Sequence, residues 1–285
     1  MNTVSKLGLI AGNGRFPFLL LDAARARGVE VVVAAIKEET EPEMEARAAA
    51  DAGITVFWLS LGELSKLIET FQSAGVTRAV MAGQVKHAKI FSGIRPDWRL
   101  AKLLMGLLHK NTDSLIGAVA RVLADEGIEL VDSTLLLKEL LAPAGAVTKR
   151  KPDSDEQRDI DYGRRIAHHL ASFDLGQSVA IADRACVALE AMEGTDAMLR
   201  RAASLVEGKR LTLVKASSRR RHLLFDVPVI GPATIDTMIE TNTTALAIDA
   251  GRTLLLDREE LLHKAAAAKI AIVGMEALPE GEKKA

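Results

Sequence analysis

The chain has 285 residues, which exceeds the commonest domain size of about 100 to 150 residues and predicts two domains. Apolar residues make up 48% and charged residues 26%, a composition that excludes a disordered or low-complexity chain. The 37 basic and 38 acidic side chains leave a net charge of −1, so the surface as a whole does not attract nucleic acid or an anionic membrane. We therefore expect no nucleic acid partner.

The cellular compartment is indicated by one cysteine and by the distribution of apolar residues. Cys186 is the single cysteine, which excludes an internal disulfide and a cysteine-rich metal site and fits a reducing compartment. No apolar run approaches the roughly 18 residues that a membrane-spanning helix needs. Near the N-terminus, Asn13 and Arg15 interrupt the apolar stretch that a signal peptide would require. We expect a cytoplasmic protein.

Short apolar runs alternate with helical periodicity through the first half of the chain. The expected strands are residues 7–11, 29–36, 55–59, 79–82 and 128–131, and helical patterns follow at 16–24, 61–71, 104–108 and 115–123. The run 29–36 shows no polar alternation, which is typical of a strand buried on both faces of a parallel sheet. We predict an N-terminal α/β domain over residues 1–142, Rossmann-like, with a mainly parallel sheet and the character of a nucleotide-binding domain.

The composition changes at residues 143–158, where basic and acidic side chains follow one another around Pro152. This segment is predicted to be a linker between domains. Beyond it, strands are expected at 179–182, 185–192, 210–214, 245–248 and 270–273, and helices near 160–173, 196–206, 235–240 and 258–268. Residues 159–285 therefore predict a second α/β domain, so the whole chain is of the α/β class.

Two glycine turns follow predicted strands of the first domain. Gly12, Asn13 and Gly14 lie between the first strand and the first helix, where backbone N–H groups and the helix N-terminus can bind a phosphate. A turn that needs glycine for a positive φ alone is the alternative interpretation. The second turn is Ala82-Gly83-Gln84. If the strands are parallel, both turns lie at their carboxyl ends, where such sheets bind ligands.

A nicotinamide or flavin cofactor is a weaker hypothesis for the first turn. The third glycine of the dinucleotide fingerprint is missing, because Phe16 and Pro17 occupy its place. The second strand ends in Ile36-Lys37 rather than in an acid for ribose hydroxyls.

Candidate site residues of the second half begin with Glu190, which interrupts an apolar strand and needs a partner if it is buried. Downstream, Thr195 can cap a helix and Asp196 can lie in its first turn, which is a purely structural interpretation. The functional interpretation makes Gly194 and Thr195 phosphate donors and a nearby acid a metal ligand.

Asp226 lies in a stiff apolar segment, because Pro228 forces Val227 into an extended conformation. A carboxylate there is either an acceptor for loop N–H groups or a catalytic group. Upstream, Lys215 and the run Arg219-Arg220-Arg221-His222 concentrate cations, which form either a solvated loop or a diphosphate clamp.

Several motifs in this order make the chain resemble the LpxI-type UDP-2,3-diacylglucosamine pyrophosphatase family, and the likeness runs nearly end to end. The motifs are Leu7-Gly8-Leu9-Ile10-Ala11-Gly12-Asn13-Gly14, Ala82-Gly83-Gln84-Val85, Ala191-Met192-Glu193-Gly194-Thr195-Asp196-Ala197-Met198-Leu199-Arg200-Arg201 and Phe225-Asp226-Val227-Pro228-Val229-Ile230-Gly231. The chain departs from the pattern just before the last motif, where Ser218-Arg219, Arg221 and Leu224 replace the usual residues.

The resemblance implies a two-domain hydrolase of lipid A biosynthesis that uses Mg²⁺. Such an enzyme splits UDP-2,3-diacylglucosamine into UMP and 2,3-diacylglucosamine 1-phosphate, with attack of water at the sugar-side phosphorus. It implies that Asp226 is catalytic, as a metal ligand or as a general base. Substrate binding is expected at Gly12, Asn13, Gly14, Ala82, Gly83, Gln84, Glu193, Gly194, Thr195, Asp196 and Lys215, and metal binding at Asp226 and Asp196.

Mg²⁺ and nearby cations would neutralise the phosphates while a carboxylate orients the metal or the water. A lipid substrate would favour peripheral contact with the cytoplasmic face of the inner membrane, and a homodimer is left open. The alternative function is a non-catalytic regulator of the same fold that binds a nucleotide-sugar or a lipid. We expect the carboxylates of the second half and the glycine turns of the first half to converge on one pyrophosphate.

Overall fold

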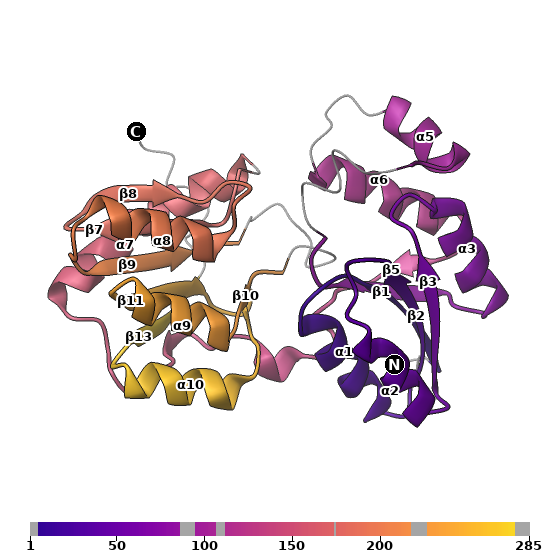
Figure 1. Ribbon diagram of the computed structural model, residues 1–285, viewed down its shortest axis with the longest axis horizontal. Coiled ribbons are helices and arrows are strands. Elements are labelled where there is room, and N and C mark those ends of the chain that lie inside the picture. Colours follow the sequence, from indigo (N-terminus) through magenta and orange to yellow (C-terminus); the bar gives the residue numbers. More distant parts are fainter. Residues whose placement is uncertain (1–4, 86–94, 107–111, 174, 218–226, 277–285) are drawn as a thin grey trace. The chain divides into compact units, whose positions relative to one another are not determined.

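The computed structural model describes residues 5–85, 95–106, 112–173, 175–217 and 227–276 (Figure 1). These residues belong to two compact units. The described part of unit 1 lies within Met1–Lys138, and that of unit 2 lies within Glu139–Arg221 and Val227–Ala285. Each unit has its own sheet and its own core, so each is described by itself.

Unit 1 is built on a five-stranded sheet in the order β3-β2-β1-β4-β5. All neighbouring strands pair in parallel, which confirms the predicted parallel sheet. The strands are β1 (Lys6–Ala11), β2 (Glu30–Ile36), β3 (Ile54–Leu59), β4 (Arg78–Ala82) and β5 (Glu129–Leu130). The β2 side chains from Val31 onward are all buried, as expected for a strand covered on both faces.

Helices cover both faces of this sheet (Figure 1). They are α1 (Phe16–Arg25), α2 (Glu43–Ala50), α3 (Leu64–Ser73), α5 (Trp98–Met105) and α6 (Thr112–Asp125). One core cluster joins the apolar side of α3, including Ile68 and Phe71, to sheet residues such as Ile10 and Val32. The helix α1 packs instead on β1, β2 and β4. The three layers place the carboxyl ends of the strands along one open edge.

Unit 2 contains a six-stranded mixed sheet in the order β6-β13-β11-β9-β7-β8. Its strands are β6 (Gly145–Ala146), β7 (Ser178–Ala182), β8 (Ala185–Leu189), β9 (Leu211–Lys215), β11 (Thr243–Asp249) and β13 (Ala271–Met275). The strands β9, β11 and β13 are parallel, and β7 pairs antiparallel with both β9 and β8. The carboxyl ends of β8, β9 and β11 therefore share an edge with the amino end of β7.

Helices again cover two faces. The long helix α7 (Ser154–Ser172) packs on one face, where Ile160 and Ala167 meet Ile181 and Val214. The opposite face carries α8 (Thr195–Leu205), α9 (Pro232–Glu240) and α10 (Arg258–Ala267). The two-stranded pair β10 (Val229–Ile230) and β12 (Leu254–Leu255) completes the unit. A 3₁₀ turn at Lys138–Leu140 begins at the last residue of unit 1 and continues into unit 2. The predicted α/β class is thus confirmed for both parts of the chain.

The segment predicted as a linker, residues 143–158, has regular structure instead. It contains β6 and the first residues of α7. The helix begins there because Asp153 and Glu156 form a capping box, which satisfies the exposed N–H groups of the first turn. Glu156 also receives two hydrogen bonds from the Arg150 guanidinium, at 2.8 and 2.9 Å. The charged residues that suggested a linker therefore form a helix start.

The strand predicted at 185–192 is shorter than expected, because β8 ends at Leu189 and Glu190 follows it. The two-residue strands β6, β10 and β12 were not predicted, since so few residues carry no periodicity. Within the part of the chain that the structure describes, no helix is long and apolar enough to cross a membrane.

Candidate functional site

The two glycine turns of unit 1 meet between β1 and β4. In the order β3-β2-β1-β4-β5 the chain leaves β1 toward one side and returns to β4 on the other, so this is the point where the strand order reverses. Open α/β sheets bind ligands outside the carboxyl ends of the strands at such a point. The structure thus brings Gly12, Asn13, Ala82 and Gln84 together, as the sequence predicts.

Contact between the two turns explains the glycine at both positions. A Cβ atom added to Gly12 would lie 2.5 Å from the Gln84 carbonyl oxygen, and one added to Gly83 would lie 2.5 Å from the Asn13 carbonyl oxygen. Gly83 and Gly14 also have φ values of 88° and 85°, which favour glycine. Gly14 has open space around its missing side chain. Positive φ is therefore the requirement at Gly14, and close backbone approach is the requirement at Gly12.

The same contact uses backbone donors of the first turn. The Gly12 N–H donates to the Ala82 carbonyl and the Asn13 N–H donates to the Gln84 carbonyl, both at 2.8 Å. A phosphate at this turn would therefore be bound through N–H groups that follow Asn13, beginning with Gly14 at the entry to α1. The substrate-binding role of the turn stays a prediction.

In unit 2, the candidate residues gather at the edge where β8 and β9 end and β7 begins. Thr195, the first residue of α8, lies at the centre of this cluster. Its hydroxyl donates to Glu190 Oε1 at 3.0 Å, lies 3.2 Å from the Lys215 ammonium, which donates to it, and lies 3.1 Å from the Ser178 hydroxyl. Glu190, Thr195 and Ser178 are buried. Glu190 thus has the partner that its burial demanded, and the Gln177 N–H reaches its second oxygen at 3.4 Å.

The start of α8 differs in one respect from the sequence prediction. Gly194, with φ 84°, is the N-cap residue, and Thr195 is already helical. Thr195 does not cap the helix, because its hydroxyl is directed to Glu190. Asp196 lies in the first turn as predicted. The amino end of α8 and the Lys215 ammonium therefore provide positive potential at the same edge, which is the chemistry that an anion needs.

Asp196 is half-buried in this cluster. Burial raises the pKa of its carboxyl group, the positive charges of Lys215 and Arg200 oppose the shift, and the Glu190 carboxylate adds to it. A carboxyl group whose pKa is raised beside a cation is better suited to accept a proton than an ordinary aspartate is. The predicted metal-binding and substrate-binding roles of Asp196 stay predictions.

Glu193 has a different environment. Its carboxylate accepts from the Arg201 guanidinium at 2.6 Å and from the Ala191 N–H at 2.9 Å. Backbone N–H donation within its own segment, together with Arg201, lowers the pKa of Glu193. These contacts fold the Glu-Gly-Thr-Asp segment against α8, so the structure supports a local structural use of Glu193. Its predicted substrate contact stays a prediction.

Asp249, at the end of β11, was not among the predicted site residues. Its Oδ2 accepts from the Ser217 N–H at 2.8 Å and from the Ser217 hydroxyl at 3.1 Å, and its Oδ1 lies 3.3 Å from His168 Nε2. Burial alone would raise the pKa of Asp249, but His168 and the Ser217 donors outweigh it and hold the pKa below its ordinary value. The sequence signal was a carboxylate that directly follows the apolar strand 245–248.

The proposed catalytic residue, Asp226, and the altered residues Ser218 to Leu224 lie outside the described residues. Within the described ranges, no group of three or more His, Cys, Asp or Glu side chains could hold a metal ion. Asp196 alone does not make a magnesium site, and the charged group that most affects its carboxyl is the ammonium of Lys215.

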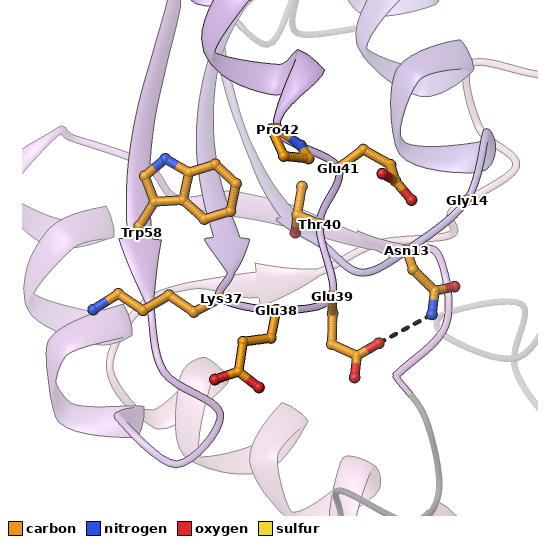
Figure 2. Close-up of a pocket in the computed structure, with 9 residues that line it drawn as sticks. All are labelled: Asn13, Gly14, Lys37, Glu38, Glu39, Thr40, Glu41, Pro42 and Trp58. Carbon is orange, nitrogen blue, oxygen red and sulfur yellow. Dashed lines mark hydrogen bonds between the residues drawn. The ribbon is translucent and has the colours of Figure 1, made fainter.

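Sequence reasoning also missed a pocket of unit 1. A cavity of about 620 Å³ lies beside the first glycine turn, lined by Asn13, Gly14, Lys37, Glu38, Glu39, Thr40, Glu41, Pro42 and Trp58 (Figure 2). An acid does follow the second strand, but it lies beyond Lys37, where the prediction did not look. A search of the whole loop after β2 for carboxylates would have found it.

Comparison with known proteins gives a consistent result. Residues 6–140 match the family model described as the LpxI N-terminal domain, and residues 143–273 match the one described as the LpxI C-terminal domain. The chain is also similar to the UDP-2,3-diacylglucosamine pyrophosphatase LpxI of Caulobacter vibrioides. The two are 31% identical over 281 residues, which cover 95% of this chain and 98% of that protein.

Proposed function

Because this chain belongs to the LpxI family, we propose that it is an enzyme that hydrolyses UDP-2,3-diacylglucosamine to UMP and 2,3-diacylglucosamine 1-phosphate. The observation that carries the proposal is the similarity to the Caulobacter vibrioides pyrophosphatase over nearly the full length of both chains. In the reaction, a water oxygen forms a bond to one phosphorus, the phosphoanhydride bond breaks, and one proton is released.

The cluster around Thr195 supports the phosphate part of this proposal. A diphosphate needs positive potential and hydrogen-bond donors, which the Lys215 ammonium and the amino end of α8 provide. Thr195 fixes the ammonium within 3.2 Å of its hydroxyl, and Glu190 fixes Thr195 in turn. A cation held in this way loses little freedom when an anion binds.

We propose that hydrolysis depends on Mg²⁺ and on Asp226, with Asp196 as the second predicted metal ligand. A bound Mg²⁺ would neutralise phosphate oxygens in the transition state. We further propose attack at the sugar-side phosphorus, cytoplasmic activity and peripheral contact with the inner membrane, since the acyl chains of the substrate lie in lipid.

The test is the Mg²⁺-dependent release of UMP from UDP-2,3-diacylglucosamine. We expect wild-type protein to release UMP, chelation of Mg²⁺ to stop the release, and Asp226→Ala to reduce it by at least about a thousandfold. Asp161→Ala is the matched control, because Asp161 is exposed on α7 and bonds to Gln157 of the same helix. In H₂¹⁸O, the label should appear in the sugar phosphate.

Three results would each contradict a part of the proposal. Substrate that stays intact after prolonged incubation with wild-type protein and Mg²⁺ would favour the non-catalytic regulator. Unchanged turnover in Asp226→Ala would remove that residue from the mechanism. Retention of activity in the presence of a chelator would exclude the dependence on Mg²⁺ and leave the rest of the proposal standing.

A further inference from the structure

The pocket of unit 1 lies where β1, β2 and β3 end. Its volume of about 620 Å³ falls within the range of small-molecule sites. Figure 2 shows Trp58, from β3, on one side and Asn13 with Gly14, from the turn after β1, on the other, with the loop of residues 37–42 between them. The pocket therefore adjoins the entry to α1.

The loop that forms the base of the pocket is firmly held. The Thr40 hydroxyl accepts from the Ile36 N–H at 2.9 Å and donates to the Ala11 carbonyl at 2.5 Å, so the loop after β2 is tied to the end of β1. Glu38 adopts a φ of 65°, a conformation that non-glycine residues adopt infrequently. Strained backbone held by buried hydrogen bonds is typical of functional sites.

Glu39 is the buried acid of this pocket. Its side chain is 4% exposed, and the Asn13 side-chain amide donates to its Oε2 at 3.0 Å, as the dashed line in Figure 2 marks. This bond orients the carboxylate toward the turn after β1. A buried carboxylate that is held in one orientation at the wall of a cavity is suited to accept hydrogen bonds from a ligand.

The charge of the lining restricts what the pocket can bind. Glu38, Glu39 and Glu41 outweigh the single cation Lys37, so a phosphate inside the pocket would be repelled. A metal ion is disfavoured too, because within the described ranges no three acidic or imidazole side chains converge to hold one. Neutral groups that donate hydrogen bonds are favoured, and vicinal hydroxyls of a ribose are such groups.

Trp58 adds an aromatic surface. Its ring is half-buried, and its Nε1 donates to the Glu45 carboxylate of α2, which fixes the orientation of the indole. A fixed indole beside polar acceptors is suited to contact a flat heterocycle.

We propose that this pocket binds the nucleoside half of a nucleotide, with Glu39 accepting the ribose hydroxyls and Trp58 contacting the base. The phosphates of the bound nucleotide would then lie outside the pocket, beside Gly14 and the amino end of α1. The order of parts along the chain, a glycine turn followed by an acid after the second strand, is that of parallel sheets that bind dinucleotides. The inference rests on the proposed function, because UDP-2,3-diacylglucosamine and its product UMP supply the nucleoside.

The test measures the binding of UMP and of 2′,3′-dideoxyuridine monophosphate to full-length protein. The chain has two tryptophans, and the exposed Trp98 can be replaced, so Trp98→Phe leaves Trp58 as the fluorescent reporter. We expect UMP to quench Trp58 emission and to bind at least about tenfold more tightly than the dideoxy analogue. In Glu39→Gln, this preference should fall to about twofold or less, because the neutral amide keeps the Asn13 contact and is a weaker acceptor.

The control variant is Glu43→Gln, which changes an exposed glutamate of α2 paired with Arg47 and should leave the UMP preference unchanged. Equal affinity of wild-type protein for both nucleotides, or an unchanged preference in Glu39→Gln, would overturn the inference, and so would the absence of UMP binding. If UMP is still released from UDP-2,3-diacylglucosamine in that case, the proposed function stands and the pocket assignment fails. If no UMP is released but binding depends on Glu39, the pocket assignment stands and the hydrolase assignment fails.

Discussion

Replacing Thr195 with valine tests the cluster at the start of α8. Valine keeps the volume and the branching of threonine but removes the hydroxyl that donates to Glu190 and accepts from Lys215. Glu190 is 9% exposed, so its charge then loses the nearer of its two hydrogen-bond donors in a buried place. A hydrogen bond to a buried charged group is worth about 1.5 to 3 kcal/mol. The Lys215 ammonium and the Ser178 hydroxyl also lose their contact with the Thr195 hydroxyl, which adds to the loss of stability. We expect a loss of about 2 to 4 kcal/mol in the free energy of unfolding.

Urea unfolding at pH 7, followed by far-ultraviolet circular dichroism, measures this loss. The matched control is Thr234→Val, which makes the same exchange of atoms at a half-buried position in the first turn of α9. That control should change the free energy of unfolding by less than about 1 kcal/mol.

A double-mutant cycle shows whether the loss comes from the Glu190 charge. In the Thr195→Val background, Glu190→Gln should recover part of the stability, because a neutral amide costs less to bury than an unpaired carboxylate. The coupling free energy should be about 1 to 2 kcal/mol. Additivity of the two substitutions within about 0.3 kcal/mol would refute the idea that Thr195 serves to stabilise Glu190.

Four further substitutions are compared with wild-type protein by the same unfolding experiment. Gly12→Ala should lower the free energy of unfolding by at least about 2 kcal/mol, because the new Cβ would lie 2.5 Å from a backbone oxygen. Gly14→Ala should lower it by about 1 kcal/mol, because the space around Gly14 is open and only its positive φ is unfavourable for alanine. Asp196→Asn should raise stability at pH 7, because burial raises the pKa of Asp196 and so penalises its charged form, and the gain should vanish near pH 3, where both folded and unfolded chains are protonated. Glu156→Ala should cost about 3 to 5 kcal/mol, because it leaves the Arg150 guanidinium without its buried carboxylate.

The outcomes that would contradict these expectations are distinct. A larger cost for Gly14→Ala than for Gly12→Ala would show that φ, and not the contact between the turns, decides the glycine. A loss of stability in Asp196→Asn at pH 7 would show that the carboxylate makes a favourable contact in the folded state. An unchanged stability in Glu156→Ala would show that the capping box does not hold the start of α7.

The sequence predicts the helices and strands of this fold well where burial produces a periodic pattern of apolar residues. The all-apolar run in β2 and the glycine stops after β1 and β4 are local signals, so the parallel sheet and the meeting of the two turns follow from them. The start of α7 was not predicted, because a run of acidic and basic residues is typical both of a loop and of the first turn of a capped helix. The capping box of Asp153 and Glu156 was visible in the sequence, so that signal was available.

Side-chain partners were harder to predict than elements, because they depend on register between distant strands. Glu190 was known to need a partner, yet the choice of Thr195 follows from the start of α8 beside the end of β8, which no local pattern specifies. Asp249 was missed for the same reason, since its donors come from Ser217 on a neighbouring strand end. Glu39 was missed because its position in the loop depends on the turn that Thr40 forms with Ile36 and Ala11.

The candidate linings of the two units differ in their chemistry. A nucleotide-sugar offers hydroxyl donors at its ribose and negative charge at its diphosphate, and one lining cannot satisfy both well, because carboxylates that accept the hydroxyls repel the phosphates. Unit 1 holds the acceptors, with Glu39 at 4% exposure, and unit 2 holds a cation at the amino end of a helix, with Lys215 fixed by Thr195. The two linings therefore differ in the kind of ligand group that each one favours. A variant that reverses the charge of the unit 1 lining, such as Glu39→Lys, should therefore weaken the preference for the ribose hydroxyls that we propose for this pocket.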